Sequence, residues 1–197
     1  MKYIYISTSA TFGNMFSVAL TSLFLPFIPM LPKQILLTNF ISDLPFLAVA
    51  SDEVDEEQIQ RPGRWKLDGI RQFMLYFGLH SSVFDFSTFA FLYFWMKAGL
   101  AEFRTAWFLE SVITEILILF VVRTKRPFFH SKPAGILLFC GIAGLAITLI
   151  LPWTPLNIGL GLTALSGKTA AGLLVILLLY LFSADWLKRW FFRNQRD

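Results

Sequence analysis

A carboxylate, an amide and a hydroxyl lie close together in an otherwise apolar run of the chain, at Asn39, Ser42 and Asp43. Asn39 and Asp43 are four residues apart, so a helix places them on one face, with Ser42 beside them. A charge at the centre of a membrane helix costs about 2.5–3.5 kcal/mol on insertion scales, and such residues face a bundle interior, a partner or an ion path. We therefore expect Asp43 to bind a cation.

Pro45 follows two residues after this carboxylate. Proline cannot donate a backbone hydrogen bond and crowds the carbonyl four residues earlier, which is that of Ile41. We expect this carbonyl to be free to point elsewhere. Carboxylate, amide, hydroxyl and carbonyl oxygens together form a hard-ligand set, which suits Mg²⁺, Ca²⁺ or a proton rather than a soft metal.

Three further apolar stretches carry an oxygen-bearing side chain about midway along, at Asn14, Asp85 and Glu115. Thr11 lies three residues before Asn14 on the same helical face, and Gly13 between them allows close helix approach. Transporters place substrate and ion sites where irregular helices meet near the bilayer midplane. The alternative for Thr11, Asn14 and the serines is that they only form hydrogen bonds between helices.

Other polar residues favour structural interpretations. Asp85 is expected to bond Ser81, Ser82 or a residue on a neighbouring helix, and Glu110 to be solvated near the outer interface. His80 is interpreted as a hydrogen-bonded packing residue.

Two acidic features near the ends of the apolar stretches also have ordinary explanations. Asp185 precedes Lys188 and Arg189 at helical spacing and predicts ion pairs. The acidic run at 52–57 predicts a solvated linker, with docking to a cytoplasmic domain as the alternative.

The composition is that of an integral membrane protein. Of 197 residues, 56% are hydrophobic and 15% are charged, and the mean hydropathy is +0.62, whereas soluble proteins have about 45–50% apolar and about 25% charged residues. No basic cluster is interleaved with aromatics, so nucleic acid is not an expected partner. The single cysteine, Cys140, excludes a disulfide framework or cysteine metal site within the chain.

Six apolar stretches are long enough for membrane helices. They lie near residues 3–25, 34–51, 71–96, 104–123, 134–152 and 169–190. The first is interpreted as a span rather than a signal peptide, because polar residues interrupt it and no small-residue cleavage site follows. The connectors are too short for a soluble domain, so residues 1–197 are expected to form a single transmembrane domain.

The positive charges predict the orientation of these six helices. Of the 17 Lys and Arg residues, Lys33, Lys97, Arg104 and Lys168 fall on one side of the expected bundle and the other thirteen on the opposite side. Positively charged loops stay in the cytoplasm. We therefore predict an all-α integral membrane protein with six transmembrane helices and both termini cytoplasmic.

Five short motifs follow one another along the chain in an order that is informative as a set. They are Ser-Ala-Thr-Phe-Gly-Asn at 9–14, the proline-rich hairpin at 25–32, Asn-Phe-Ile-Ser-Asp at 39–43, Phe-Asp-Phe-Ser-Thr-Phe at 84–89 and Val-Arg-Thr-Lys-Arg-Pro-Phe at 122–128. Together they resemble the C-terminal membrane half of a P-type cation-transporting ATPase, its fifth to tenth membrane helices, most closely in the bacterial magnesium-transporting group.

This resemblance implies a set of cation ligands. The sixth-helix pattern maps onto Asn39, Ser42 and Asp43, the fifth-helix pattern onto Thr11 and Asn14, and an eighth-helix position onto Glu115. The chain departs from the family at three of them: Asn14 stands where calcium pumps carry a carboxylate, Thr11 where asparagine is usual, and Glu115 where magnesium-type relatives often look uncharged. The implied transported ion is Mg²⁺, with Asp43 as its main charged ligand.

The family's ATP-driven parts have no counterpart in these 197 residues, which lack the Asp-Lys-Thr-Gly-Thr, Thr-Gly-Glu-Ser and Gly-Asp-Gly motifs and hold no ATP site. The leading hypothesis is therefore the transport-domain portion of a pump in the inner membrane, a multi-pass fragment in the lipid bilayer. Its expected partners are N-terminal helices and cytoplasmic domains outside the chain. The alternatives are a non-enzymatic subunit that stabilises a separately encoded pump half, and an unrelated six-helix transporter or channel.

Overall fold

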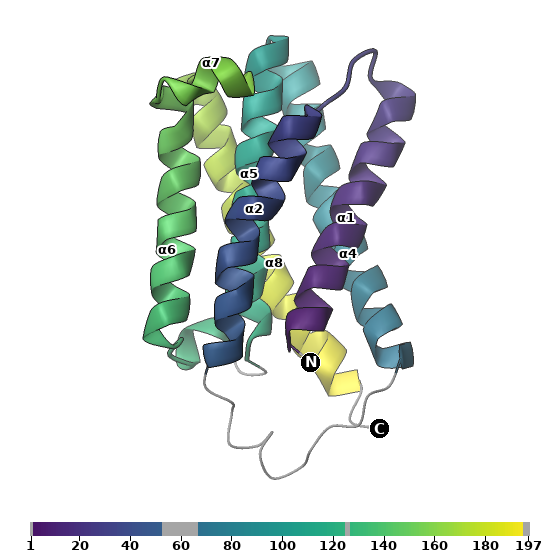
Figure 1. The fold of residues 1–197 in the computed structure, drawn as a ribbon. Coiled ribbons are helices and arrows are strands. Elements are labelled where there is room, and N and C mark those ends of the chain that lie inside the picture. The colour runs from purple at the N-terminus through teal and green to yellow at the C-terminus, as the bar shows by residue number, and fades with distance from the viewer. Residues whose placement is uncertain (1, 53–66, 125–126, 195–197) are drawn as a thin grey trace.

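The computed structural model describes residues 2–52, 67–124 and 127–194. Within them the chain forms a bundle of upright helices and contains no strand (Figure 1). Its long helices are α1 (Lys2–Phe24), α2 (Pro32–Ala48), α4 (Leu67–Ala90), α5 (Leu100–Val122), α6 (Gly135–Ile150) and α8 (Gly167–Asn194). The start of α1 and the end of α8 lie at the same end of the bundle, which we call the lower end after its place in Figure 1.

α5 is the central helix of the bundle. It packs against α1, α2, α4, α6 and α8. In the most apolar stretch of α5, 89% of the residues are buried, whereas the corresponding share in α8 is 22%. α1 lies mainly against α4 on one side of α5, while α2 lies against α6 on the other. Because α1 and α2 make few contacts with each other, the fold leaves space between them in front of α5.

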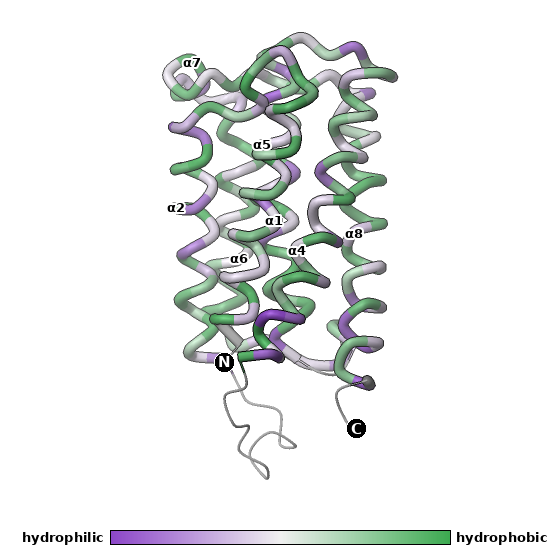
Figure 2. Tube along the Cα trace, turned by 90° about the vertical axis from the view of Figure 1, so that its right-hand side faces the viewer, coloured by the Kyte–Doolittle hydropathy of each residue, from purple (hydrophilic) through white to green (hydrophobic). Residues whose placement is uncertain are grey.

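The membrane character of the helices follows their composition. Hydrophobic residues make up most of each helix (Figure 2), and four of the described helices, at 32–51, 100–122, 135–153 and 167–193, are long and apolar enough to cross a membrane. α1 and α4 are as long but carry buried polar residues, including Ser17, Ser82 and Asp85. The prediction of an all-α membrane protein is confirmed.

The helix limits differ slightly from those expected. α2 continues through Pro45 and ends in a 3-10 turn at Val49–Ser51, and α4 ends in a π-helical turn at Phe91–Trp95. A short helix that sequence periodicity did not predict, α7 (Leu156–Leu160), follows α6 and ends at Gly161, whose φ of 69° favours glycine.

Small residues set the distance between α1 and α4. A Cβ atom added to Gly13 would lie 3.1 Å from the carbonyl oxygen of Gly78, and one added to Gly78 would lie 2.4 Å from the Phe12 ring. Ser82 also donates a hydrogen bond to the Gly13 carbonyl at 3.2 Å. The close approach expected at Gly13 therefore occurs, and it brings the polar faces of α1 and α4 together.

Paired charges join the helices at the lower end. Arg123, directly after α5, forms an ion pair of 3.3 Å with Asp52, whose Oδ1 also accepts from the Ala134 backbone N–H at 3.1 Å. Asp52 is therefore buried, which corrects its assignment to a solvated linker; the rest of the acidic run, 53–57, lies outside the described residues.

The ion pairs predicted for Asp185 are confirmed. Its carboxylate lies 2.8 Å from Lys188 Nζ and 3.2 Å from Arg189 Nε, and it also accepts a hydrogen bond from the Phe128 backbone N–H at 3.2 Å. Lys188 Nζ donates to the Val121 carbonyl of α5 at 3.0 Å. These contacts tie α8 to the end of α5.

Candidate cation site

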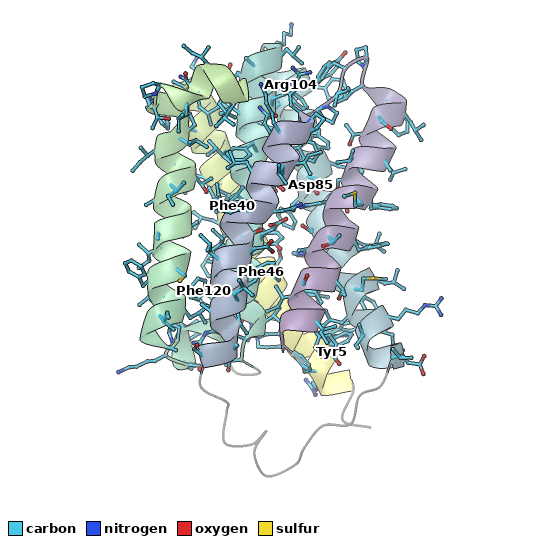
Figure 3. All side chains as sticks on the ribbon, viewed as in Figure 1. Tyr5, Phe40, Phe46, Asp85, Arg104 and Phe120 are labelled. Carbon is cyan, nitrogen blue, oxygen red and sulfur yellow. The ribbon has the colours of Figure 1, made fainter. Side chains whose placement is uncertain are left out.

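A cavity of about 240 Å³ lies in the space between α1 and α2, with α5 behind it. Side chains with oxygen atoms point into the region between α1 and α2 at mid-height (Figure 3). All six candidate ligands line the cavity: Thr11 and Asn14 from α1, Asn39, Ser42 and Asp43 from α2, and Glu115 from α5. Residues that are up to about 100 positions apart in sequence thus share one site.

α2 supplies an amide, a hydroxyl and a carboxylate. Asn39 and Asp43 are exposed to the cavity opening, whereas Ser42 is buried. The Ser42 hydroxyl donates to the carbonyls of Thr38 at 3.0 Å and Asn39 at 3.3 Å. Its lone pairs remain available to a ligand, because this hydroxyl donates its single proton to the helix.

α1 and α5 are joined across the back of the cavity. The Asn14 amide nitrogen donates a hydrogen bond to Glu115 Oε1, and Asn14 Oδ1 accepts one from Ser111 Oγ at 3.4 Å. Asn14 therefore holds the Glu115 carboxylate at the cavity wall. The long bond from Ser111 leaves the Asn14 carbonyl oxygen weakly occupied.

The electrostatics of the cavity are acidic. Glu115 interacts electrostatically with Asp43 and also with Asp85 outside the lining. The ion pairs of Asp52 and Asp185 lie at the lower end of the described bundle, and neither Asp43 nor Glu115 takes part in them. In the described part of the chain no group of three or more His, Cys, Asp or Glu converges as in a metal cage. The cavity instead combines two carboxylates with neutral oxygens.

Four other residues that carry a hydroxyl group or an indole N–H line the cavity and were not predicted as site residues: Ser7, Thr38, Trp107 and Ser111. The three hydroxyl residues each precede a candidate ligand by four positions, so helical spacing from Thr11, Ser42 and Glu115 could have found them. Trp107 carries no such signal, because an aromatic residue in an apolar helix is ordinary core.

The Ile41 carbonyl does not face the cavity. Its oxygen lies 3.7 Å from the position of a Cβ added to Gly144 of α6, and Ile41 is absent from the cavity lining. Because α6 packs closely on this side of α2, the carbonyl beside Pro45 points towards α6. The expectation that it joins the ligand set is therefore not supported by this geometry.

Three polar residues outside the cavity, Asp85, His80 and Glu110, are buried or hydrogen-bonded between helices. Asp85 is bonded to neighbouring helices as expected, through Ser17 at 2.5 Å and Trp107 at 2.8 Å. His80 Nε2 lies 2.9 Å from Ser183 Oγ of α8, which confirms its packing role. Glu110 is 1% exposed rather than solvated, because α5 is enclosed on every side by other helices.

Comparisons with known proteins agree with this architecture. Residues 27–190 match the family model described as "Cation transporting ATPase, C-terminus". The chain is 37% identical over 98% of its length to the "Magnesium-transporting ATPase, P-type 1" of Salmonella typhimurium strain 14028s, and 36% identical over the same share to that of Escherichia coli K12. A putative cation-transporting ATPase of Methanocaldococcus jannaschii is 28% identical over 73% of the chain.

The chain spans 22% of the length of the two bacterial relatives and 18% of the archaeal one. The match therefore concerns one region of these ATPases, and it covers the cavity-lining segments of α2 and α5. From the matched residues and the identity over nearly its whole length, the chain belongs to the family of C-terminal membrane regions of P-type cation-transporting ATPases, close to the magnesium-transporting members.

Proposed function

We propose that this chain forms the ion-binding part of an ATP-driven P-type pump in the inner membrane, and that Mg²⁺ is the transported ion. The observation that carries the proposal is the convergence of Asp43, Glu115 and four neutral oxygen-bearing side chains on one cavity. The identity of the ion is suggested by the names of the bacterial relatives, which are magnesium-transporting ATPases.

The size of the cavity suits a hydrated cation. One water needs only about 10–15 Å³ of such space, so a cavity of about 240 Å³ holds an ion together with several waters. Mg²⁺ dehydrates reluctantly, keeps several waters and binds through one or two carboxylates. Asp43 and Glu115 match that requirement in number and in charge, while the amides and hydroxyls hydrogen-bond the ion's waters.

The placement of the two carboxylates on different helices suits alternating affinity. Asp43 belongs to α2 and Glu115 to α5, so a shift of α2 along α5 separates the two charges and weakens cation binding. Phosphorylation of a cytoplasmic domain supplies such a shift in a P-type pump. That domain lies outside these 197 residues, in the same polypeptide or in a separate one.

Mg²⁺ binding to the purified chain in lipid nanodiscs, measured by isothermal titration calorimetry, tests the proposal. Asp43→Asn should weaken binding at least tenfold, because it removes the charged ligand at the cavity opening. Asp68→Asn, an exposed carboxylate in the first turn of α4, is the matched control and should bind as the unaltered chain does. Equal affinities for all three proteins, or tighter binding of Ca²⁺ than of Mg²⁺, would overturn the proposal.

A further inference from the structure

A second pair of carboxyl groups lies inside the bundle, away from the cavity. Asp85 of α4 is 2% exposed and Glu110 of α5 is 1% exposed, and their side chains are within hydrogen-bonding reach of each other. Neither is among the described residues that line the cavity. Nothing in the cation site described above accounts for this contact.

The hydrogen bonds around the pair are unequal. Asp85 accepts at both oxygens, from Ser17 Oγ of α1 at 2.5 Å and from Trp107 Nε1 of α5 at 2.8 Å. Glu110 Oε2 has no hydrogen-bond partner among the described residues. Donors therefore surround Asp85 and favour its ionised form, whereas the free oxygen of Glu110 has nothing to stabilise a negative charge.

The contact between the two carboxyl groups requires a proton. Ionised carboxylates only accept hydrogen bonds, so two of them cannot bond each other. Two negative charges side by side in a buried site are also strongly unfavourable, which is why paired carboxyls share a proton. One proton on Glu110 satisfies the contact, because Glu110 then donates its O–H to the Asp85 carboxylate.

The surrounding groups reinforce this assignment. The titratable groups that interact with the pair are Glu115, farther along α5, and Tyr180 of α8; α1 presents the neutral Ser17. The ion pairs between Asp52, Asp185 and basic residues do not include either carboxyl group.

A metal ion fits this place poorly. The indole N–H of Trp107 is only a donor and cannot ligate a cation, and it occupies one Asp85 oxygen while Ser17 occupies the other. A cation at Asp85 would lie close to the indole N–H of Trp107, whose positive end repels it. A proton satisfies the Asp85–Glu110 contact without displacing anything.

We propose that Asp85 and Glu110 form a proton-binding site in the membrane interior, with one proton carried by Glu110 and shared with Asp85. The site is linked to the cation cavity through Trp107, whose N–H binds Asp85 and whose ring lines the cavity. The proton site does not depend on which cation the cavity binds.

Infrared spectroscopy of the chain in nanodiscs at neutral pH tests the proposal, because a protonated carboxylic acid has a C=O stretch that a carboxylate lacks. Glu110→Gln should remove one such band, which in the unaltered protein shifts on exchange into D₂O. Glu102→Gln is the matched control. Glu102 lies in the first turn of the same helix and accepts hydrogen bonds from the Thr169 hydroxyl and the Ser166 N–H. Its substitution should remove no carboxylic acid band.

Labelling the unaltered protein with [¹³C]glutamate keeps the test valid if the variant fails to fold. The carboxylic acid band should shift with the label, which assigns a proton to a glutamate without any substitution. Two results would overturn the proposal: no labelled carboxylic acid band in the unaltered protein, or a spectrum that Glu110→Gln leaves unchanged. A metal site in its place would show as loss of one bound Mg²⁺ in Glu110→Gln.

Discussion

The carboxylates of this chain fall into two regions that differ in their partners. At the lower end of the bundle, Asp52 pairs with Arg123, and Asp185 pairs with Lys188 and Arg189. Farther into the bundle, Asp43, Glu115, Asp85 and Glu110 have no Lys or Arg ion-pair partner among the described residues. Basic side chains neutralise the first group and hold the helices together. We propose that the second group binds cations that come from solution.

Access divides the inner carboxylates further. Asp43 is exposed at an opening with space for a hydrated ion, and Glu115 lies at the back of the same cavity. Asp85 and Glu110 are buried, and Asp85 accepts hydrogen bonds from Ser17 of α1 and Trp107 of α5. We therefore propose that the same chemical group binds a metal ion where water can enter and a proton where it cannot.

Arg123→Met should have the largest effect, because it leaves Asp52 buried without its cation. Removing one partner of a buried ion pair costs about 3–5 kcal/mol. Thermal or denaturant unfolding of the chain in detergent measures this loss. Arg71→Met, at an exposed position of α4, should change stability by less than about 0.5 kcal/mol; equal effects of the two variants would mean that the lower-end pairs do not stabilise the bundle.

Trp107→Phe should have the next largest effect and act on the sealed pair. It removes the donor to Asp85 Oδ1 but keeps an aromatic ring against Phe89. Leaving a buried acceptor without its donor costs about 1–3 kcal/mol, which unfolding measurements detect. Trp153→Phe, at a residue that is 62% exposed, controls for loss of an indole; if it costs as much, the bond to Asp85 contributes nothing.

Glu115→Gln should weaken Mg²⁺ binding about tenfold, which corresponds to ~1.4 kcal/mol, while the fold is kept. The amide has the shape of the carboxylate but lacks its charge, so the cavity retains its volume and loses half of its negative charge. Calorimetric titration with Mg²⁺ measures the change. An affinity equal to that of the unaltered chain would remove Glu115 from the cation site.

Ser111→Ala should have the smallest effect. The bond from Ser111 to Asn14 is long, at 3.4 Å, and hydrogen bonds between membrane helices average about 0.6 kcal/mol. Stability should therefore fall by no more than this amount, as it should for Ser87→Ala, whose hydroxyl bonds its own helix. A loss of Mg²⁺ binding comparable with that of Asp43→Asn would instead make Ser111 a ligand.

Much of the fold and of the candidate site could be predicted from sequence, because each rests on local periodicity. Long apolar stretches identify the helices, and polar residues at helical spacing identify the faces of α1 and α2 that meet at the cavity. The expectations for Asp52 and Glu110 were wrong, and the expectation for the Ile41 carbonyl was unsupported, for a common reason. Their surroundings depend on which helices pack against them, and single-helix patterns carry no information on that.

One measurement compares the Asp43–Glu115 pair with the Asp85–Glu110 pair most directly. It is the number of Mg²⁺ ions bound per chain at saturation in nanodiscs. We predict that Asp43→Asn loses the bound Mg²⁺ at concentrations that saturate the unaltered chain, and that Glu110→Gln retains it. The opposite result, with Mg²⁺ retained in Asp43→Asn and lost in Glu110→Gln, would place the cation between α4 and α5 and contradict the account.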